Sequence, residues 1–307
     1  MKKMLLMSVL LAMMVLAACS MEAPGSDSEE TTGGEDASGD YTIGFSISTL
    51  NNPFFVTLSE GAEAKASELG ASLSVVDAQD DASKQASDVE DLIQQGVDMI
   101  LINPVDSEAV ASAVESANNA NIPVITVDRS AEGGEVVSHI ASDNTAGGEM
   151  AGEYLLSLVG DDAKVAELEG VPGSSAARER GEGFNNVATD SLDVVAKQTA
   201  NFNRAEGLSV MENILQANPD VTGVFAHNDE MALGALEAIE AAGKDVAVVG
   251  FDATNDAVAA VEEGRLDGTV AQKPELIGEM AVETAIQHLD GEEVETSIPV
   301  ELELIQP

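Results

Sequence analysis

From Tyr41 onward, short apolar segments alternate with longer segments whose apolar residues recur at helical spacing. Such alternation is typical of parallel strands that helices cover on both faces. Asn52-Pro53 marks the start of one helix, because Asn caps helices and Pro suits the first turn, and Gly70 marks its end. The pattern predicts strands at 42–47, 73–76, 99–102, 124–127, 165–168, 194–198, 221–225 and 246–251, with further helices around 89–93, 110–117, 145–158, 175–189, 204–217 and 229–242.

The chain is long enough for two lobes. Its 307 residues suffice for two domains of ordinary size, each with its own core. The segments 95–103 and 218–226 echo one another, since each runs from a turn through a buried strand into a polar loop. The predicted fold class is therefore α/β, with two doubly wound parallel-sheet lobes.

The N-terminal segment follows a different pattern. Two lysines precede an apolar run at 4–16 that is too short to span a membrane as a mature helix. Cys19 is the only cysteine, and the sequence Leu-Ala-Ala-Cys that it ends resembles the lipobox of bacterial lipoproteins. That resemblance implies a signal peptide at 1–18 and acylation of Cys19; the alternative is an incidental cysteine after an ordinary signal peptide. Residues 19–40 are rich in Ser, Gly, Asp and Glu and predict a flexible tether.

The charge of the chain is strongly acidic, with 13 Lys and Arg against 56 Asp and Glu and a formal net charge of -43. Such a surface repels nucleic acid and anionic lipid, so neither is expected as a partner. Acidic chains stay disordered when their apolar content is low, whereas 44% of these residues are hydrophobic. The composition therefore predicts an acidic, solvated surface over an ordinary core. Adaptation to high salt, where screening relieves self-repulsion, is one open explanation.

Polar side chains follow several of the predicted strands, where ligands bind in open parallel sheets. Arg180 lies instead in a predicted helix after a Gly/Ser turn. Asp accepts the proton of a hydroxyl, Arg donates through a rigid fork, and Asn and Gln do both, so these residue types suit a small polyhydroxylated ligand. Spacing alone leaves open that Asp128 and Arg129 form only a local ion pair. The candidates at strand ends are Asn52, Asp128, Arg129, Asn228, Asp252 and Gln272.

Three of the seven phenylalanines are further candidates for the ligand site. Phe54 and Phe55 lie in the first turn of the helix that Asn52 begins, and Phe202 lies in a polar loop. Each ring either packs locally or presents a flat apolar platform to the C–H face of a sugar ring. The residues alone leave both interpretations open.

The motifs predict neither catalysis nor a metal or cofactor. His139, His227 and His288 are isolated and lack metal-ligand spacing. The sequence has no nucleophile elbow and no Ser/His/Asp or Cys/His set. Asp128 and Asp252 form the one conceivable acid–base pair, but no leaving-group machinery accompanies them. A binding protein without metal or cofactor is therefore favoured over an enzyme.

Four segments resemble the bacterial periplasmic D-ribose-binding proteins, which belong to the sugar ABC transporter substrate-binding family. These segments are 48–55, 121–129, 175–184 and 228–235, within a similarity that extends from Tyr41 to Leu304. The resemblance implies a receptor that binds D-ribose in the cleft between its lobes and delivers it by hinge closure to the membrane permease of an ABC importer. It implies ten sugar contacts, at Asn52, Phe54, Phe55, Asp128, Arg129, Arg180, Phe202, Asn228, Asp252 and Gln272.

The same resemblance implies a periplasmic binding protein-like fold of type I, with a hinge of three strands. The chain would cross between the lobes near Ser142, Gln272 and Val300. The implied N-terminal lobe holds 41–142 and 273–300, and the C-terminal lobe holds 143–272 and 301–307.

The chain also departs from that family. The lipobox and tether imply export and anchoring to the outer face of the cell membrane through a lipid on Cys19. His227 stands where the family pattern has Gln, which predicts a slightly altered rim of the cleft. A monomer is expected, and a chemoreceptor is a further candidate partner. One alternative is a receptor for a different ligand: another pentose, allose or galactose, or a furanose signalling molecule. Two alternatives come from other protein classes: the effector domain of a sugar-responsive repressor, and an enzyme.

Overall fold

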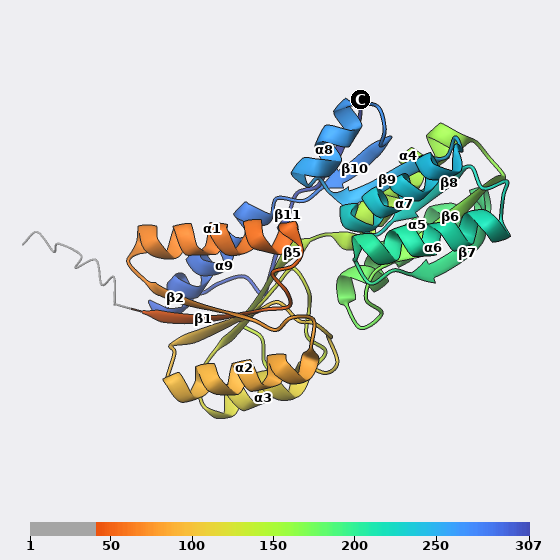
Figure 1. The fold of residues 1–307 in the computed structure, drawn as a ribbon. Helices are drawn as coiled ribbons and strands as arrows, with labels where there is room; N and C mark the ends of the chain where they lie inside the picture. The colour runs from red at the N-terminus through yellow and green to blue at the C-terminus, as the bar shows by residue number, and fades with distance from the viewer. Residues whose placement is uncertain (1–40) are drawn as a thin grey trace, which may run out of the picture. The chain divides into compact units, whose positions relative to one another are not determined.

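The computed structural model describes residues 41–307 (Figure 1). The predicted signal peptide at 1–18 and the predicted tether at 19–40, including Cys19, lie outside the described residues. Across 41–307, strands and helices alternate almost without interruption, and the strands form two sheets. Within this range, each helix is too short or too polar to cross a membrane.

The first sheet within 41–307 has six parallel strands in the order β11-β5-β4-β3-β1-β2. Helices α1 (Pro53–Leu69) and α9 (Pro274–Leu289) pack on one face, and α2 (Ala82–Gln95) and α3 (Ala111–Asn119) pack on the other. The strands are β1 (Thr42–Ile47), β2 (Ser72–Asp77), β3 (Met99–Ile102), β4 (Val124–Val127), β5 (Ser138–Ser142) and β11 (Ser297–Val300).

The second sheet of the described range has the order β12-β10-β9-β8-β6-β7, and β12 is antiparallel to β10. Helices α4 (Asn144–Val159) and α5 (Ser175–Ser191) cover one face, and α6 (Arg204–Ala217), α7 (Asp229–Ala242) and α8 (Asn255–Glu262) cover the other. The strands are β6 (Ala163–Glu169), β7 (Leu192–Thr199), β8 (Gly223–Ala226), β9 (Ala247–Asp252), β10 (Gly268–Ala271) and β12 (Glu303–Ile305).

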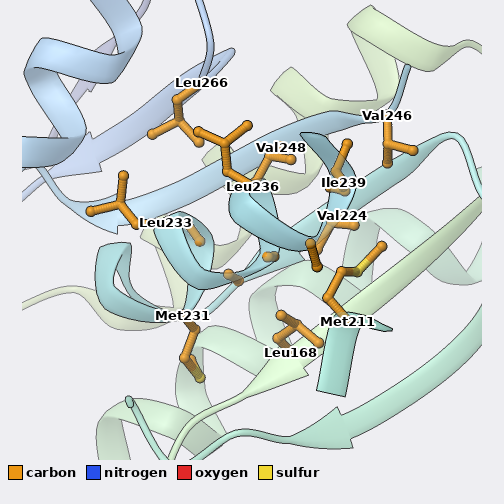
Figure 2. Packing of buried hydrophobic residues seen from close by; sticks show 14 of the residues in the cluster. Leu168, Met211, Val224, Met231, Leu233, Leu236, Ile239, Val246, Val248 and Leu266 are labelled. Atoms are coloured by element: carbon orange, nitrogen blue, oxygen red, sulfur yellow. The ribbon is translucent and has the colours of Figure 1, made fainter. Parts of the chain in front are cut away.

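Apolar side chains fill the space between each sheet and its helices. Figure 2 shows one such cluster, in which Met211 of α6 and Leu236 of α7 pack with Val224 and Val248 of the second sheet. Full burial of a side chain of this size stabilises the fold by about 1.5–3 kcal/mol. Because both faces of both sheets carry a buried cluster, the predicted α/β class with two doubly wound lobes is confirmed.

The chain passes between the two sheets at three places. It leaves the first sheet after β5, which ends at Ser142, and returns through Gln272, which follows β10. It leaves again after β11, which ends at Val300, and adds β12 to the second sheet. These are the crossings that the family topology predicted. The division into lobes of 41–142 with 273–300 and 143–272 with 301–307 stays a prediction, which the strand membership of the sheets supports.

Several strands and helices of the structure were not predicted from the hydrophobic periodicity of the sequence. The strands β5, β10, β11 and β12 have only three to five residues, and β5 and β10 read Ser-His-Ile-Ala-Ser and Gly-Thr-Val-Ala. One or two large apolar residues in so short a segment give no recognisable period. Helices α8 and α9 lie beyond the last strand that the pattern predicted. By contrast, Asn52 and Gly70 bound α1 as predicted, with Gly70 in the left-handed region at φ 77°.

Candidate ligand-binding site

One small cavity collects the side chains that the sequence singled out. Most of them follow the carboxyl ends of parallel strands of both sheets, the usual place for ligands in open α/β sheets. All ten predicted contact residues line it. Ala176 of α5 also lines it and was not predicted from the sequence. The structure therefore brings the predicted set together from both lobes. That these residues contact a ligand stays a prediction.

The start of α1 contributes three lining residues. The Oδ1 atom of Asn52 accepts a hydrogen bond of 3.0 Å from the amide of Phe54, so the helix cap holds Asn52 beside the cavity. Phe54 and Phe55 follow in the first turn as an edge-to-face pair, with ring centroids 5.2 Å apart and planes at 85°. Both rings also belong to the core beneath α1 and α9. Core packing and cavity lining therefore go together for this pair.

The strand β4 is followed directly by Asp128 and Arg129, which are both buried. Asp128 has φ 64°, a conformation that costs a non-glycine residue free energy, and its Oδ2 accepts a hydrogen bond of 3.3 Å from Asn103. The Nε atom of Arg129 lies 3.8 Å from the same oxygen, and its Nη1 donates over 3.1 Å to the carbonyl of Pro104. The local ion pair therefore exists, but it is loose. It leaves Asp128 Oδ1 and Arg129 Nε without hydrogen-bond partners.

The guanidinium group of Arg129 lies close to aromatic rings of both lobes. Its Cζ atom is 4.9 Å from the centroid of Phe55 and 5.3 Å from that of Phe202. Phe202 is in the left-handed region, at φ 58°, in the turn between β7 and α6. Its ring rests on the backbone of Gly170, where a Cβ atom would overlap it. This close approach directs Phe202 to the cavity from the C-terminal lobe.

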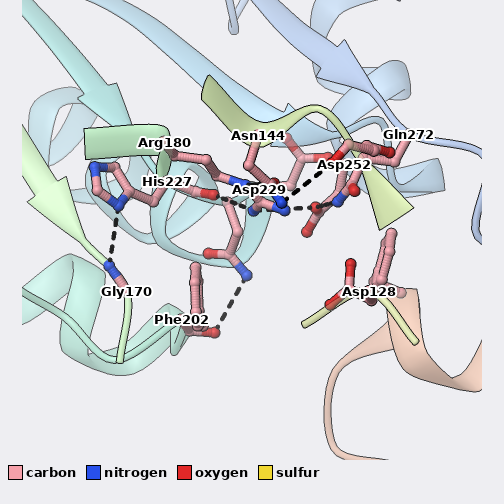
Figure 3. Close-up of polar contacts among 12 residues, drawn as sticks. Asp128, Asn144, Gly170, Arg180, Phe202, His227, Asp229, Asp252 and Gln272 are labelled. Atoms are coloured by element: carbon pink, nitrogen blue, oxygen red, sulfur yellow. Dashed lines mark hydrogen bonds and ion pairs between the residues drawn. The ribbon is translucent and has the colours of Figure 1, made fainter. Parts of the chain in front are cut away.

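Arg180 is held by three neighbours, and Figure 3 labels two of them, Asn144 and His227. Its Nε donates over 2.8 Å to Oδ1 of Asn144, and its Nη1 donates over 2.7 Å to the carbonyl of His227. The Cζ atom lies 3.9 Å from the ring centroid of Phe251. The predicted helix after the Gly/Ser turn is confirmed as α5, and Gly148 of α4 lets the backbone of Arg180 approach, because a Cβ there would overlap its carbonyl. Asn144, which positions this guanidinium group, was not among the residues predicted from the sequence.

Asp252 and Gln272 complete the C-terminal side of the cavity. Gln272 Nε2 donates over 2.8 Å to Asp252 Oδ1, and Arg180 Nη1 lies 3.6 Å from the same oxygen (Figure 3). The bond fixes the orientation of the Gln272 amide, so its Oε1 faces away from Asp252 and has no partner. Asn228 follows β8 and caps the start of α7. Its Oδ1 accepts a hydrogen bond of 3.0 Å from the amide of Met231, and its Nδ2 donates one of 3.4 Å to the carbonyl of Phe202.

Burial shifts the titration of the four charged lining residues. It lowers the pKa of Arg129 and of Arg180, and it raises the pKa of Asp128 and, further, that of Asp252. The opposite charges counteract each shift, since the arginines favour ionised carboxylates and the carboxylates favour charged guanidinium groups. The cavity thus pairs two cations with two carboxylates in a site from which water is largely excluded.

Three lining atoms are buried without a hydrogen-bond partner: the acceptors Asp128 Oδ1 and Gln272 Oε1, and the donor Arg129 Nε. A buried polar group without a partner costs about 1–3 kcal/mol. A ligand that both donates and accepts hydrogen bonds would satisfy all three. In the range 41–307, no group of three or more His, Cys, Asp or Glu side chains is placed to hold a metal ion.

The family model for the periplasmic binding protein domain matches residues 43–293 of this chain. The chain belongs to the periplasmic binding protein family. In Bacillus subtilis (strain 168), the ribose import binding protein RbsB is 55% identical over 304 residues, which cover 99% of each chain. In Escherichia coli (strain K12), the protein of the same name is 55% identical over 266 residues, or 86% of this chain and 90% of the relative.

Solved structures of periplasmic binding proteins share the fold. An ABC transporter solute binding protein from Bacillus halodurans C-125 with bound myo-inositol superposes with a TM-score of 0.83 at 36% identity, over 89% of this chain and 96% of that chain. A periplasmic solute binding protein from Actinobacillus succinogenes 130z with bound D-allose superposes with a TM-score of 0.82 at 31% identity. The match covers 87% of this chain and 97% of that chain. The type I fold of periplasmic binding proteins is thereby confirmed.

One expectation about the cleft of this periplasmic binding protein is wrong. His227 is not part of the rim, because its side chain is fully buried and bonded to Glu167 behind the cavity. The error arose because position 227 precedes a lining residue in the sequence. The residue after a strand points either into the cavity or behind it, and sequence spacing alone does not decide which.

Proposed function

We propose that the protein is the solute-binding receptor of an ABC importer, which binds D-ribose in the cavity and delivers it to the membrane permease. One observation carries this proposal: a chain 55% identical over its length to a ribose import binding protein encloses all ten predicted sugar contacts in one cavity. The named relatives are import and transport proteins, in agreement with the prediction that the chain is not an enzyme.

The unpartnered atoms suit the hydroxyl groups of a sugar. A hydroxyl donates one hydrogen bond and accepts two, so ribose would donate to Asp128 Oδ1 and Gln272 Oε1 and accept from Arg129 Nε. The rings of Phe54, Phe55 and Phe202 supply apolar surface for the C–H faces of the sugar.

Direct contacts between the lobes support delivery by hinge closure. Beside the cavity, the amide of Ser107 donates over 2.9 Å to the carbonyl of Gly173, and the amide of Ser130 donates over 2.9 Å to Oγ of Ser175. Arg178 also pairs with Glu132 of the other lobe. A ligand that touches both lobes favours the closed state through contacts which the open state lacks, and a permease can then distinguish loaded from empty receptors by shape.

The family places the protein outside the cytoplasm, and we propose in addition that it is anchored to the outer face of the cell membrane through acylated Cys19. The lipobox and the segment 19–40 support this. Labelling of growing cells with radioactive palmitate should mark the wild type and not the Cys19→Ser variant, whereas an unlabelled wild type would contradict lipid anchoring. We expect a monomer, with a chemoreceptor as a further candidate partner of the closed form.

Calorimetric titration of the purified protein against D-ribose, L-arabinose, D-galactose, D-allose and myo-inositol tests the proposed ligand. We expect ribose to bind at micromolar or tighter Kd, which corresponds to about -8 kcal/mol or better, and to bind more tightly than every other sugar of the panel. Allose or inositol binding more tightly than ribose would reassign the receptor to that sugar. Failure of the whole panel would refute the proposed function.

A further inference from the structure

A buried His–Glu pair lies behind the cavity in the C-terminal lobe. His227 and Glu167 are both 0% exposed, and His227 Nε2 lies 3.0 Å from Glu167 Oε1. The carboxylate has two further partners, since Lys197 Nζ lies 3.3 Å from Oε2 and Asn185 Nδ2 donates over 3.3 Å to the same atom. The imidazole packs against α5 at Gly181, where a Cβ would lie 3.2 Å from its Cε1 atom. The pair is therefore held by both polar and packing contacts.

The hydrogen bonds determine the tautomer of His227. The amide of Gly170 donates to Nδ1 over 3.4 Å, so Nδ1 carries a lone pair and no proton (Figure 3). The proton of the neutral ring then lies on Nε2, from which it is donated to Glu167. Burial lowers the pKa of His227, which favours the neutral ring. Burial would raise the pKa of Glu167, but hydrogen bonds from His227 and Lys197 and the charge of Lys197 counteract it, and the pKa is lowered, which favours the carboxylate.

The pair connects to three residues that line the cavity. The carbonyl of His227 accepts the 2.7 Å bond from Arg180 Nη1. The next residue is Asn228, which caps α7. The third connection runs through Gly170, whose amide is bonded to the imidazole and whose backbone supports the ring of Phe202. One buried side chain thus contacts the backbone that places a cation, an amide and an aromatic ring at the cavity.

We propose that His227 is a positioning residue for the sugar site, which holds Gly170 against Phe202 and holds its own carbonyl under Arg180 through its bonds to Gly170 and Glu167. This inference rests on the proposed function. His227 touches no ligand atom in it, since the side chain does not line the cavity. Its role depends on one acceptor and one donor at fixed positions, which imidazole provides in the Nε2–H tautomer.

Two substitutions separate hydrogen bonding from packing. In His227→Gln, the amide can accept from Gly170 and donate to Glu167, whereas Leu in His227→Leu fills similar space with neither group. We expect His227→Leu to weaken D-ribose binding about 10- to 100-fold and His227→Gln to recover most of that loss. His288→Gln, at the end of α9 in the other lobe, is the matched control and should bind as the wild type does. Equal affinities of the Leu variant and the wild type would overturn the proposal.

A double-mutant cycle distinguishes positioning from a general loss of stability. If His227 acts through Phe202, His227→Leu should cost clearly less affinity in a Phe202→Leu background than in the wild type. Additive losses would overturn the connection through Gly170. Calorimetry with D-ribose on the four proteins, each checked by thermal melting, gives the coupling.

Nitrogen NMR of the wild-type protein tests the same inference, and the conservative variant His227→Gln is needed only to assign the signals. The chain has three histidines, so the His227 signals are assigned by their loss in His227→Gln. We expect a protonated Nε2 and an unprotonated Nδ1 at neutral pH, and a protonated Nδ1 would overturn the proposal. Because this result needs no sugar, it stands apart from the ribose titration: a wild type that binds none of the sugars would refute the proposed function and leave the bonding of His227 to be decided by NMR.

Discussion

Replacement of Arg129 by Ala removes a buried cation that lies near aromatic rings of both lobes. The side chain is 4% exposed and lies near Phe55 and Phe202, which come from different lobes. Its Nε atom has no partner within the protein, and its Nη1 is bonded to the carbonyl of Pro104. The truncation should therefore remove a donor to the ligand and a contact between the lobes at once.

The expected loss follows from these contacts. A hydrogen bond from a charged donor contributes about 1.5–3 kcal/mol, and a desolvated cation–π contact contributes about 2 kcal/mol. Since the contacts are not additive, we expect a total of about 2–4 kcal/mol, or about 30- to 700-fold in Kd. Stability should change less, because the variant no longer buries a guanidinium group beside Arg180. Burial already raises the pKa of Asp128, and loss of the neighbouring cation should raise that pKa further.

Calorimetry with D-ribose measures the effect, and thermal melting shows whether the lobes still fold. Arg265→Ala is the matched control, since this arginine is about half exposed and pairs with exposed carboxylates. Arg129→Lys should fall between the wild type and Arg129→Ala, because lysine keeps the charge and loses the planar fork. A loss below about fivefold in a folded Arg129→Ala variant would refute the role assigned to Arg129, since that is less than one charge-assisted bond contributes.

Three further predictions concern pH, sterics and salt. Burial raises the pKa of Asp229 to about 7, above the unfolded value of about 3.9, so the folded state holds a proton that the unfolded state releases and stability should fall as pH rises from 4 to 7. Asp229→Asn should melt with a weaker pH dependence over that range; an identical slope would contradict the shift. Gly170→Ala should weaken ribose binding about tenfold by displacing Phe202, and unchanged affinity would show that the ring is free to move. If the charge of -43 reflects adaptation to salt, the melting temperature should rise from dilute to molar NaCl, and a constant or falling value would exclude it.

The fold could be predicted where the local signal was strong. Short, mostly apolar segments predicted the central strands, and Asn52 and Gly70 predicted both ends of α1. The short strands β5, β10, β11 and β12 could not be found by period, because they form through pairing with neighbouring strands that lie far away in the sequence. The resemblance to a family supplied the crossings near them, which periodicity did not reach.

The residues that line the site could be predicted from the sequence, but the residues behind it that hold them in place could not. Polar residues at strand ends follow from α/β topology, so Asp128 and Asp252 were recognisable as candidates. Asn144, Glu167 and His227 act from behind the cavity, and their partners come from elements that only the tertiary fold brings together. A buried carboxylate in a strand such as Glu167 is a usable signal, since an acidic residue within a buried strand requires a partner.

The central claim is that this cavity binds D-ribose through its unpartnered atoms, and a crystal structure of the protein with D-ribose tests it most directly. We expect one sugar in the cavity, with hydroxyl groups within hydrogen-bond distance of Asp128 Oδ1, Arg129 Nε and Gln272 Oε1 and with both lobes in contact with it. A sugar bound elsewhere, or bound there with these three atoms still unpartnered, would contradict the account.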